Sequence, residues 1–400
     1  MTTPLEKLLE SARTHLYPNY RQPDLVMSHG EGVYVWDTSG KRYLDMYAGI
    51  AVNVLGHAHP AIVSALQEQA ARLGHMSNYF YNEPNIELAE RLCRLTGMQR
   101  VLFGNSGTEA NEAMLKLARH HFYSAGQVER YRVIAFENSF HGRTLGALAL
   151  TGQDKYREGF GPLPGVSHVP FGDLAAVERT MGPDVAAVIV ETVQGEGGVV
   201  PASAGFLEGL RKLTEAQGAL LLIDEIQTGV ARTGRFLGIH HYPRVRPDAL
   251  SMAKALAGGV PIGAMLCTEK LAGALPPGSH GSTFGGNPLA SRVALSVLDV
   301  VEKRDLAGHS ARVGAYLGER LAALTRYPAV TGARGQGLLQ ALELSETVDA
   351  RTVVTDLREA GVLVTVAGGR ALRFSPPLII TQEQVDEGVG IVAEVVGRLT

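Results

Sequence analysis

The sequence predicts an α/β fold: one large domain with a mostly parallel β-sheet, and one small α+β domain built from both ends of the chain. Short strands that are apolar throughout, such as VAAVIV at 185–190 and ALLLI at 219–223, alternate with helical patterns. Strands of this kind are typical of a parallel sheet that helices cover on both faces. The pattern changes at both ends of the chain, and this change predicts the small domain.

The central region is expected to alternate strand and helix. Strands are predicted at 100–103, 131–136, 185–190 and 219–223, and helices at 109–121 and 204–217. Gly218 is a typical signal for the end of the second helix.

The two ends of the chain follow other patterns. The segment 33–44 (VYVWDTSGKRYL) predicts a β-hairpin with a Ser-Gly turn. Long helices are expected from about Pro288, and short strands and turns from Gly332 to Pro377. We therefore expect a large domain at 60–285, and a small domain that joins 1–59 to 286–400.

Composition excludes several classes of protein. The 400 residues carry a formal net charge of −3 and are 45% hydrophobic, which is ordinary for a globular protein. A nucleic-acid binder would normally show a basic excess. The N-terminus lacks the apolar core of a signal peptide, and no uncharged apolar run approaches the ~18 residues that span a bilayer. Two cysteines do not form a disulfide framework. A cytoplasmic protein without nucleic-acid or membrane partners is expected.

Four polar segments follow the predicted strands, at 105–109, 138–144, 191–198 and 224–227. In open parallel sheets, ligands bind beyond the carboxyl ends of the strands. The convergence of these segments predicts a single binding site at that edge of the sheet.

Two of these segments indicate particular chemistry. Ser106, Gly107 and Thr108 precede a helix, where free backbone N–H groups and the helix dipole favour a phosphate. The alternative is a plain helix cap with Glu109 in the first turn. Asp224 ends an apolar strand, where a carboxylate is costly unless it is paired, so a cationic partner is expected. The alternative is a purely structural carboxylate.

Lys254 is the candidate nucleophile. It lies in SMAKALAGG, among small and apolar neighbours. A desolvated amine has a lowered pKa and can attack a carbonyl. The alternative is an ordinary solvated surface lysine, but the residues that flank Lys254 are not solvating. Arg143 and Arg373 are isolated arginines, suited to two-pronged recognition of a carboxylate, and Glu196 is a natural reversible partner for one of them. The alternative for each arginine is a structural ion pair.

Other reaction classes find less support. The string ALLLIDE resembles the strand of an NTPase that ends in Asp-Glu, but the chain has no Gly-x-x-x-x-Gly-Lys-Ser/Thr loop. The histidine pairs at 57/59, 120/121 and 240/241 lack helical i, i+4 spacing with carboxylates nearby, so no catalytic metal is expected.

Taken together, the motifs resemble class III aminotransferases of fold type I, which use pyridoxal 5′-phosphate (PLP). The resemblance runs from about Tyr20 to Leu378, and rests on GIAVNVLGHAHP, FGNSGTEANEAMLKLAR, SFHGRTLGALALTG, QGEGGV, LLIDEIQTGVARTGR, PDALSMAKALAGGVPIGA, HGSTFGGNPLA and RFSPPL. One departure is that the family usually has Glu-Pro where this chain has Glu191-Thr192, which frees a backbone N–H.

The resemblance implies roles around the cofactor. Lys254 would hold PLP as a Schiff base and move a proton, and Asp224 would keep the pyridine nitrogen protonated. Gln227 would lie near the ring hydroxyl and Phe140 would stack on the ring. The phosphate would be held by Ser106, Gly107 and Thr108, with Thr283 reaching it from the partner subunit of a homodimer whose sites are shared.

The resemblance also implies a substrate site. Arg143 would anchor the α-carboxylate of N-acetylornithine, and Arg373 that of glutamate. Glu196 would neutralise Arg373 while the ω-amine is bound. Ser282 and Tyr20 are expected to complete the substrate site.

The expected activity is transfer of the ω-amino group of N-acetylornithine to 2-oxoglutarate, in arginine biosynthesis. Alternative amines are ornithine, succinylornithine, 4-aminobutyrate and a carrier-linked substrate of lysine synthesis. A PLP protein without turnover, an aminomutase and a racemase remain alternatives from other classes. The pair of arginines with Glu196 favours a transaminase that processes two substrates.

Overall fold

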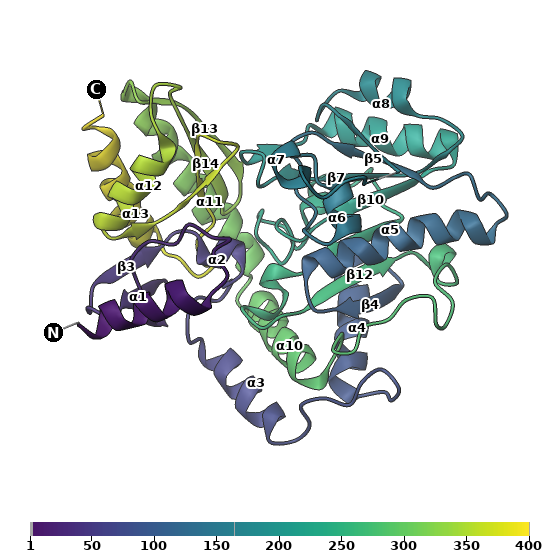
Figure 1. Ribbon diagram of the computed structural model, residues 1–400, viewed down its shortest axis with the longest axis horizontal. Coiled ribbons are helices and arrows are strands. Elements are labelled where there is room, and N and C mark those ends of the chain that lie inside the picture. The colour runs from purple at the N-terminus through teal and green to yellow at the C-terminus, as the bar shows by residue number, and fades with distance from the viewer. Residues whose placement is uncertain (1–2, 164, 400) are drawn as a thin grey trace.

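The large lobe is built around a seven-stranded sheet in a computed structural model that describes residues 3–163 and 165–399 (Figure 1). The strands lie in the order β4 (Arg100–Gly104), β12 (Gly263–Cys267), β11 (Ala249–Met252), β10 (Leu220–Asp224), β7 (Val185–Glu191), β5 (Arg132–Phe136) and β6 (Val166–Val169). Only β12 runs antiparallel to its neighbours. The predicted mostly parallel α/β sheet is confirmed.

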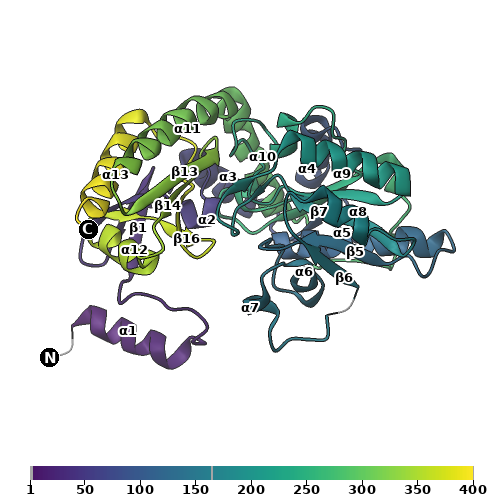
Figure 2. The same cartoon turned by 90° about the horizontal axis from the view of Figure 1, so that it is seen from above.

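Helices cover both faces of this sheet, because its strands are apolar on both sides. Leu220 and Leu222 of β10 pack in the same core as α5 (Gly107–Ser124). Leu221 and Ile223 pack in the core that includes α9 (Ala204–Gln217). Figures 1 and 2 show α5 and α9 on opposite sides of the sheet. The alternation of side chains along a strand therefore gives each helix its own layer.

The prediction for α9 is confirmed at both ends. Ser203 caps the helix by accepting a hydrogen bond from the backbone N–H of Phe206, and Gly218 follows in the left-handed conformation. The other elements of this lobe are α3 (Pro60–Ala70), α4 (Glu83–Thr96), α6 (Leu145–Leu150), α7 (Asp154–Arg157), α8 (Leu174–Thr180), β8 (Val193–Gln194), β9 (Val200–Pro201), and the short 3₁₀ helices η1 (Gly238–His241), η2 (Lys254–Ala257) and η3 (Glu269–Leu271).

The small lobe combines both ends of the chain. One sheet has the order β1-β2-β3-β15, so it joins N-terminal strands to a C-terminal one, and the other has the order β13-β14-β17-β16. The bounds are α1 (Pro4–His15), β1 (Met27–Glu31), β2 (Tyr34–Asp37), β3 (Arg42–Asp45), α2 (Ala48–Ala51), α11 (Leu306–Ala322), η4 (Ala323–Arg326), β13 (Val330–Gln336), β14 (Leu339–Leu344), α12 (Ala350–Glu359), β15 (Val362–Leu363), β16 (Thr365–Ala367), β17 (Ala371–Phe374) and α13 (Gln382–Val396).

Two predictions for this lobe have different outcomes. The hairpin at 33–44 is confirmed as the antiparallel pair β2 and β3. The region from Gly332 to Pro377 contains the expected strands, but it also contains α12, which the sequence analysis did not foresee. Helix α1 stands apart from the rest of the lobe, and none of its residues is buried (Figure 2).

Helix α10 (Pro288–Lys303) lies between the two lobes. It packs against α3, α4 and η2 and also contacts α11, so it touches both parts of the molecule. The division of the chain at 59/60 and 285/286 remains a proposal. Among the described residues, no helix has the length and apolar character that crossing a bilayer requires.

The backbone next to the cavity takes an unusual course at α2. Four consecutive residues, Ala48 to Ala51, have positive φ angles of 49, 62, 66 and 62°, and only the second of them is a glycine. The carboxylate of Asp45 holds the start of this turn by accepting hydrogen bonds from the N–H groups of Tyr47 (3.1 Å) and Ala48 (2.7 Å). It also pairs with Nε2 of His57 at 2.8 Å.

Candidate active site

A cavity of about 400 Å³ lies at the carboxyl ends of β4, β5, β7 and β10. Each of the four polar segments singled out from the sequence contributes to its wall, as do η2 and the residues after it. The lining includes Val52, Asn105, Ser106, Gly107, Thr108, Phe140, His141, Gly142, Arg143, Glu191, Glu196, Asp224, Ile226, Gln227, Ala253, Lys254 and the segment 259–262. The predicted convergence at one edge of the sheet is confirmed.

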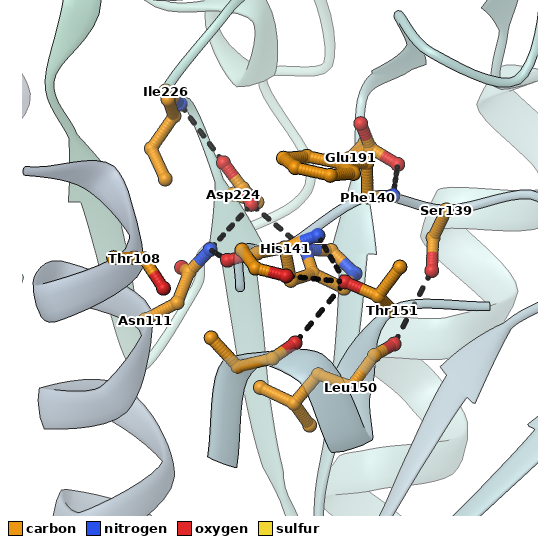
Figure 3. Close-up of polar contacts among 12 residues, drawn as sticks. Thr108, Asn111, Ser139, Phe140, His141, Leu150, Thr151, Glu191, Asp224 and Ile226 are labelled. Atoms are coloured by element: carbon orange, nitrogen blue, oxygen red, sulfur yellow. Dashed lines mark hydrogen bonds and ion pairs between the residues drawn. The ribbon is translucent and has the colours of Figure 1, made fainter. Parts of the chain in front are cut away.

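Asp224 is a buried carboxylate of the cavity that several hydrogen bonds hold in place (Figure 3). Only 4% of this residue is exposed. Its carboxylate accepts hydrogen bonds from Nδ2 of Asn111 (2.8 Å), Nδ1 of His141 (2.7 Å) and the backbone N–H of Ile226 (2.9 Å). Among the described residues, no lysine or arginine forms an ion pair with Asp224. The partner is instead a histidine that the sequence analysis left without a role.

Lys254 opens η2 and projects into the same cavity. Burial lowers the pKa of its amine, although the nearby carboxylate of Glu196 opposes this shift. Within the described part of the chain, the amine has neither a hydrogen-bond partner nor an ion pair. It is a free amine with a raised fraction of the unprotonated form, as attack on an aldehyde requires.

The N-terminus of α5 supplies the features expected of a phosphate site. Ser106 accepts a hydrogen bond from the N–H of Glu109 at 3.3 Å, so the residue caps the helix and also lines the cavity. The hydroxyl of Thr108 accepts from the N–H groups of Arg143 (3.1 Å) and Thr144 (3.2 Å). A Cβ at Gly107 would lie 2.7 Å from Cδ1 of Ile226, so glycine is needed there.

Two further side chains complete the floor of the cavity. Phe140 lines it, with the ring of Tyr156 meeting its edge at a centroid distance of 5.9 Å. Gln227 is 8% exposed, and its Oε1 is buried without a hydrogen-bond partner. These groups fit PLP. They offer an amine for its aldehyde, a carboxylate for its ring nitrogen, an unpartnered amide oxygen for its polar edge, an aromatic face, and a helix N-terminus for its phosphate.

Arg373 and Glu196 form an ion pair beside the cavity. Arg373 belongs to β17 of the small lobe and is only 2% exposed. Its Nη1 also donates to the carbonyl of Gly195 (3.3 Å), and its Nε donates to Oγ1 of Thr365 (3.2 Å). Burial alone would raise the pKa of Glu196, but the charges of Arg373 and Lys254 outweigh this effect and hold the pKa below its ordinary value.

Arg143 is arranged differently. Its side chain is exposed, and its guanidinium stands 3.8 Å from the centroid of the Tyr156 ring and 5.5 Å from that of Phe140. No carboxylate forms an ion pair with it among the described residues. Tyr156 was missed by the sequence analysis, because a tyrosine in the one-turn helix α7 carries no sequence signal for a contact with a residue thirteen positions earlier.

Four of the predicted site residues do not line the cavity, and one of them is Arg373, which reaches it only through Glu196. Tyr20 is 75% exposed and Thr283 is exposed, so this single chain places neither of them at the site. Ser282 lies at the margin, where its hydroxyl accepts a hydrogen bond from Nδ2 of Asn105 at 3.0 Å.

Thr192, which stands where the family usually has proline, is fully buried. Its carbonyl accepts from the N–H of Ala202 at 2.9 Å, while its hydroxyl has no partner. A Cβ on Gly238 would lie 2.1 Å from that hydroxyl, so the threonine packs directly against η1. Thr192 therefore holds the segment between Glu191 and Glu196 in two ways, through the hydrogen bond of its backbone to Ala202 and through the packing of its side chain against η1.

No group of histidine, cysteine and acidic residues in the described ranges is arranged to hold a metal ion.

Comparison with known proteins agrees with this geometry. The family model described as aminotransferase class-III matches residues 16–396. An acetylornithine aminotransferase of Myxococcus xanthus is 48% identical over 385 residues, which are 95% of each chain. The structure of the acetylornithine aminotransferase of Elizabethkingia anophelis superposes with a TM-score of 0.87 at 36% identity, covering 99% of both chains.

An ornithine aminotransferase of Toxoplasma gondii, with PLP at partial occupancy in its active site, gives a TM-score of 0.94 at 36% identity. The match covers 99% of this chain and 95% of the other. The family model spans almost the whole sequence, and the relatives match at full length. The chain belongs to the class III aminotransferases and is a PLP-dependent enzyme.

Proposed function

We propose that the enzyme transfers the δ-amino group of N-acetylornithine to 2-oxoglutarate, as in arginine biosynthesis. The observation that carries this proposal is the pair of unlike arginines, one open and one closed by Glu196, at a cavity that holds a free buried amine. The acetylornithine aminotransferases that match at 42–48% identity over nearly the full length support the choice of amine.

When bound, PLP would supply an aldehyde to receive the amino group and a ring to take up electrons from the carbon that loses a proton. We propose that Lys254 holds this group and moves the proton, because its unpaired amine faces the cavity. Asp224 would hold the proton of the ring nitrogen, and its three hydrogen bonds would fix its orientation. The remaining contacts are proposed for Phe140, Gln227, Ser106, Gly107 and Thr108, all of which line the cavity.

The two substrates pose opposite demands. N-acetylornithine presents an amine far from its charged end, whereas glutamate presents an amine beside a carboxylate. We propose that Arg143 binds the distant carboxylate of the first substrate, and that Arg373 binds the α-carboxylate of the second after Glu196 releases it. One nitrogen of Arg373 contacts Glu196, and a substrate carboxylate that replaces Glu196 can form a two-pronged bond with the guanidinium, which makes the exchange feasible.

The substrate preference is tested by a comparison of kcat/KM for five amines with 2-oxoglutarate: N-acetylornithine, ornithine, succinylornithine, 4-aminobutyrate and lysine as a free-amine control. The proposal expects the highest value for N-acetylornithine. A higher value for ornithine would assign the chain to the activity named for the Toxoplasma structure. A chain that binds PLP but converts none of the amines would contradict transamination.

A homodimer with shared sites is also proposed. Two observations support it. Thr283 is exposed and lies outside the cavity of its own chain. Large aromatic side chains are also exposed in the segment between α3 and α4, where Tyr79 and Tyr81 are each 92% exposed. Exposed apolar surface of this kind is typical of an interface. Ser282 would lie at the substrate side of that interface, and Tyr20 would reach the site there. The cytoplasm is the proposed location, and both cysteines are free thiols.

Mixed dimers test the sharing of sites. Lys254→Ala and Thr283→Ala each damage a different part of the site, and if one chain supplies Lys254 while the other supplies Thr283, each variant alone has low activity. In a mixed dimer, one of the two sites would receive both mutations and the other would receive neither. Mixing should therefore restore activity above that of either parent. Activity no greater than the average of the parents would contradict the sharing.

A further inference from the structure

Glu191 is a buried carboxyl at the cavity that has no part in the proposed chemistry. It ends β7, and in the register of the two parallel strands it stands directly beside Asp224 at the end of β10. Paired residues on neighbouring strands point to the same face of the sheet, so the two carboxyl groups share one wall of the cavity. Glu191 is 7% exposed and Asp224 is 4% exposed.

The two carboxyl groups are hydrogen-bonded very unequally. Counting the described residues, Asp224 accepts three bonds of 2.7–2.9 Å, whereas Glu191 accepts one, from the backbone N–H of Phe140 at 3.4 Å (Figure 3). Hydrogen bonds to the charged form favour ionisation, and burial without them disfavours it. Two neighbouring buried carboxyl groups do not ionise together readily, so the better-solvated member takes the charge.

We propose that Glu191 is the proton-bearing member of a carboxyl pair with Asp224, and that it acts as a positioning residue by confining the single negative charge of the pair to Asp224. The charge then lies where His141 and Asn111 hold it. This inference concerns the chain itself and does not depend on which amine the enzyme uses.

The charged groups around Glu191 are consistent with this assignment. Burial raises the pKa of Glu191 well above its ordinary value, and the charge of Asp224 raises it further. Lys254, on η2, opposes the shift, and Glu196, on the loop after β8, adds to it. The hydrogen bond from the Phe140 amide to Glu191 also opposes the shift but does not reverse it.

Glu191→Gln is the matched variant, because glutamine keeps the shape and the acceptor oxygen but cannot ionise. In the folded wild type, Glu191 keeps its proton up to its raised pKa, whereas in the unfolded chain it loses the proton near the ordinary pKa of glutamate. The stability of wild type relative to the variant should therefore be highest at low pH, and should decline as the pH rises through the raised pKa of Glu191. Exposed Glu178 supplies the control, and Glu178→Gln should follow the wild-type curve.

The experiment measures urea unfolding of the full-length chain from pH 5 upward, with PLP bound and after its removal, for wild type, Glu191→Gln and Glu178→Gln. The expected result is that only the difference between wild type and Glu191→Gln changes with pH, and that it moves in favour of the variant. A difference that stays constant with pH would overturn the proposal.

Infrared difference spectra supply a second readout that a purely structural role would not move. A protonated carboxyl group has a C=O stretch that an ionised one lacks. At neutral pH, wild type minus Glu191→Gln should show this band, while any band from buried Glu225 cancels because both proteins contain it. Absence of the band would show that Glu191 is ionised, and would overturn the proposal even if Glu191→Gln proved poorly folded.

Asp224→Asn tests the pairing itself. Removal of the neighbouring charge should lower the pH at which the stability difference between Glu191→Gln and its parent stops changing, because that pH follows the folded pKa of Glu191. If this pH does not move in the Asp224→Asn background, the pairing is overturned. Because none of these measurements records turnover, their failure would leave the proposed transamination standing, and a failed substrate panel would leave the carboxyl pair standing.

Discussion

Arg143 lines the cavity and Arg373 lies beside it, so the same guanidinium group occurs at one site under opposite conditions. Arg373 is 2% exposed, comes from the small lobe and is ion-paired with Glu196. Arg143 is exposed, comes from the large lobe and rests on the face of Tyr156. A buried arginine without a counter-charge is costly, so Arg373 needs a partner whenever substrate is absent, whereas water and an aromatic ring are sufficient for Arg143. The comparison indicates that burial, and not residue type, decides which carboxylate site has a gate.

The largest expected effect is that of Arg373→Ala. This change removes one partner of a buried charge pair, which typically costs about 2–5 kcal/mol of binding. We expect kcat/KM for glutamate to fall by about 10²–10³-fold, where each 1.4 kcal/mol is about tenfold. The half-reaction with N-acetylornithine, measured in a single turnover, should fall far less. An equal loss of activity with both substrates would mean that Arg373 and Arg143 do not each bind a different substrate.

Glu196→Gln should have the next largest effect, because it leaves Arg373 without a counter-charge. We expect KM for glutamate to decrease and KM for N-acetylornithine to rise about tenfold, which corresponds to about 1.4 kcal/mol. Steady-state assays with each amine measure both constants. If both constants moved in the same direction, Glu196 would not be a gate.

The charge of Glu196 also makes a stability prediction. Its folded pKa lies below the ordinary value of 4.5, so its contribution is present above that pH and is lost as the pH falls through the lowered pKa. The advantage of wild type over Glu196→Gln in urea unfolding should therefore shrink only below about pH 4.5. A loss of this stability advantage already at neutral pH would contradict the ion pair between Glu196 and Arg373.

Arg143→Ala should have a smaller effect, because an exposed charge contributes less. We expect KM for N-acetylornithine to rise about tenfold or less, since exposed ion pairs contribute about 1 kcal/mol at most. KM for glutamate should stay unchanged. Arg179, exposed on α8 and away from the cavity, supplies the control in Arg179→Ala.

Tyr156→Leu should have the smallest effect. It keeps the bulk beneath Arg143 but removes the ring face, and an exposed cation–π contact is worth about 0.5–1 kcal/mol. We expect KM for N-acetylornithine to rise about two- to fivefold, and to rise no further when Arg143 is already alanine. An additive loss in the double variant would show that Tyr156 contacts the substrate by itself.

The parts of the fold that could be predicted are those with a strong local pattern. The strands β7 and β10 are apolar throughout, and α9 carries both of its end signals. Strand β12 was not foreseen, because GAMLC is short and follows a run of glycine and proline. Helix α12 was missed because Val353 and Leu357 are the only large buried residues along it.

The site was predictable to the same extent. Residues that end a strand or begin a helix, such as Asp224 and Thr108, are marked by their position in a local pattern. The partners of Asp224 are not: Asn111 lies 113 residues away and His141 lies 83 residues away, so only the folded chain brings them together. The same holds for the unequal bonding of Glu191, which has no sequence signal.

The left-handed turn at Ala48–Ala51 has a consequence for attempts to make the enzyme more heat-resistant. Each non-glycine residue in that conformation costs about 1–2 kcal/mol, and Val52, which lines the cavity, follows directly. Selection for thermal tolerance should favour glycine in place of Ile50, which is 40% exposed and is the bulkiest residue of the turn. The same replacement would give the mouth of the cavity more freedom, so resistance to heat and discrimination between amines should be traded against each other at this one position.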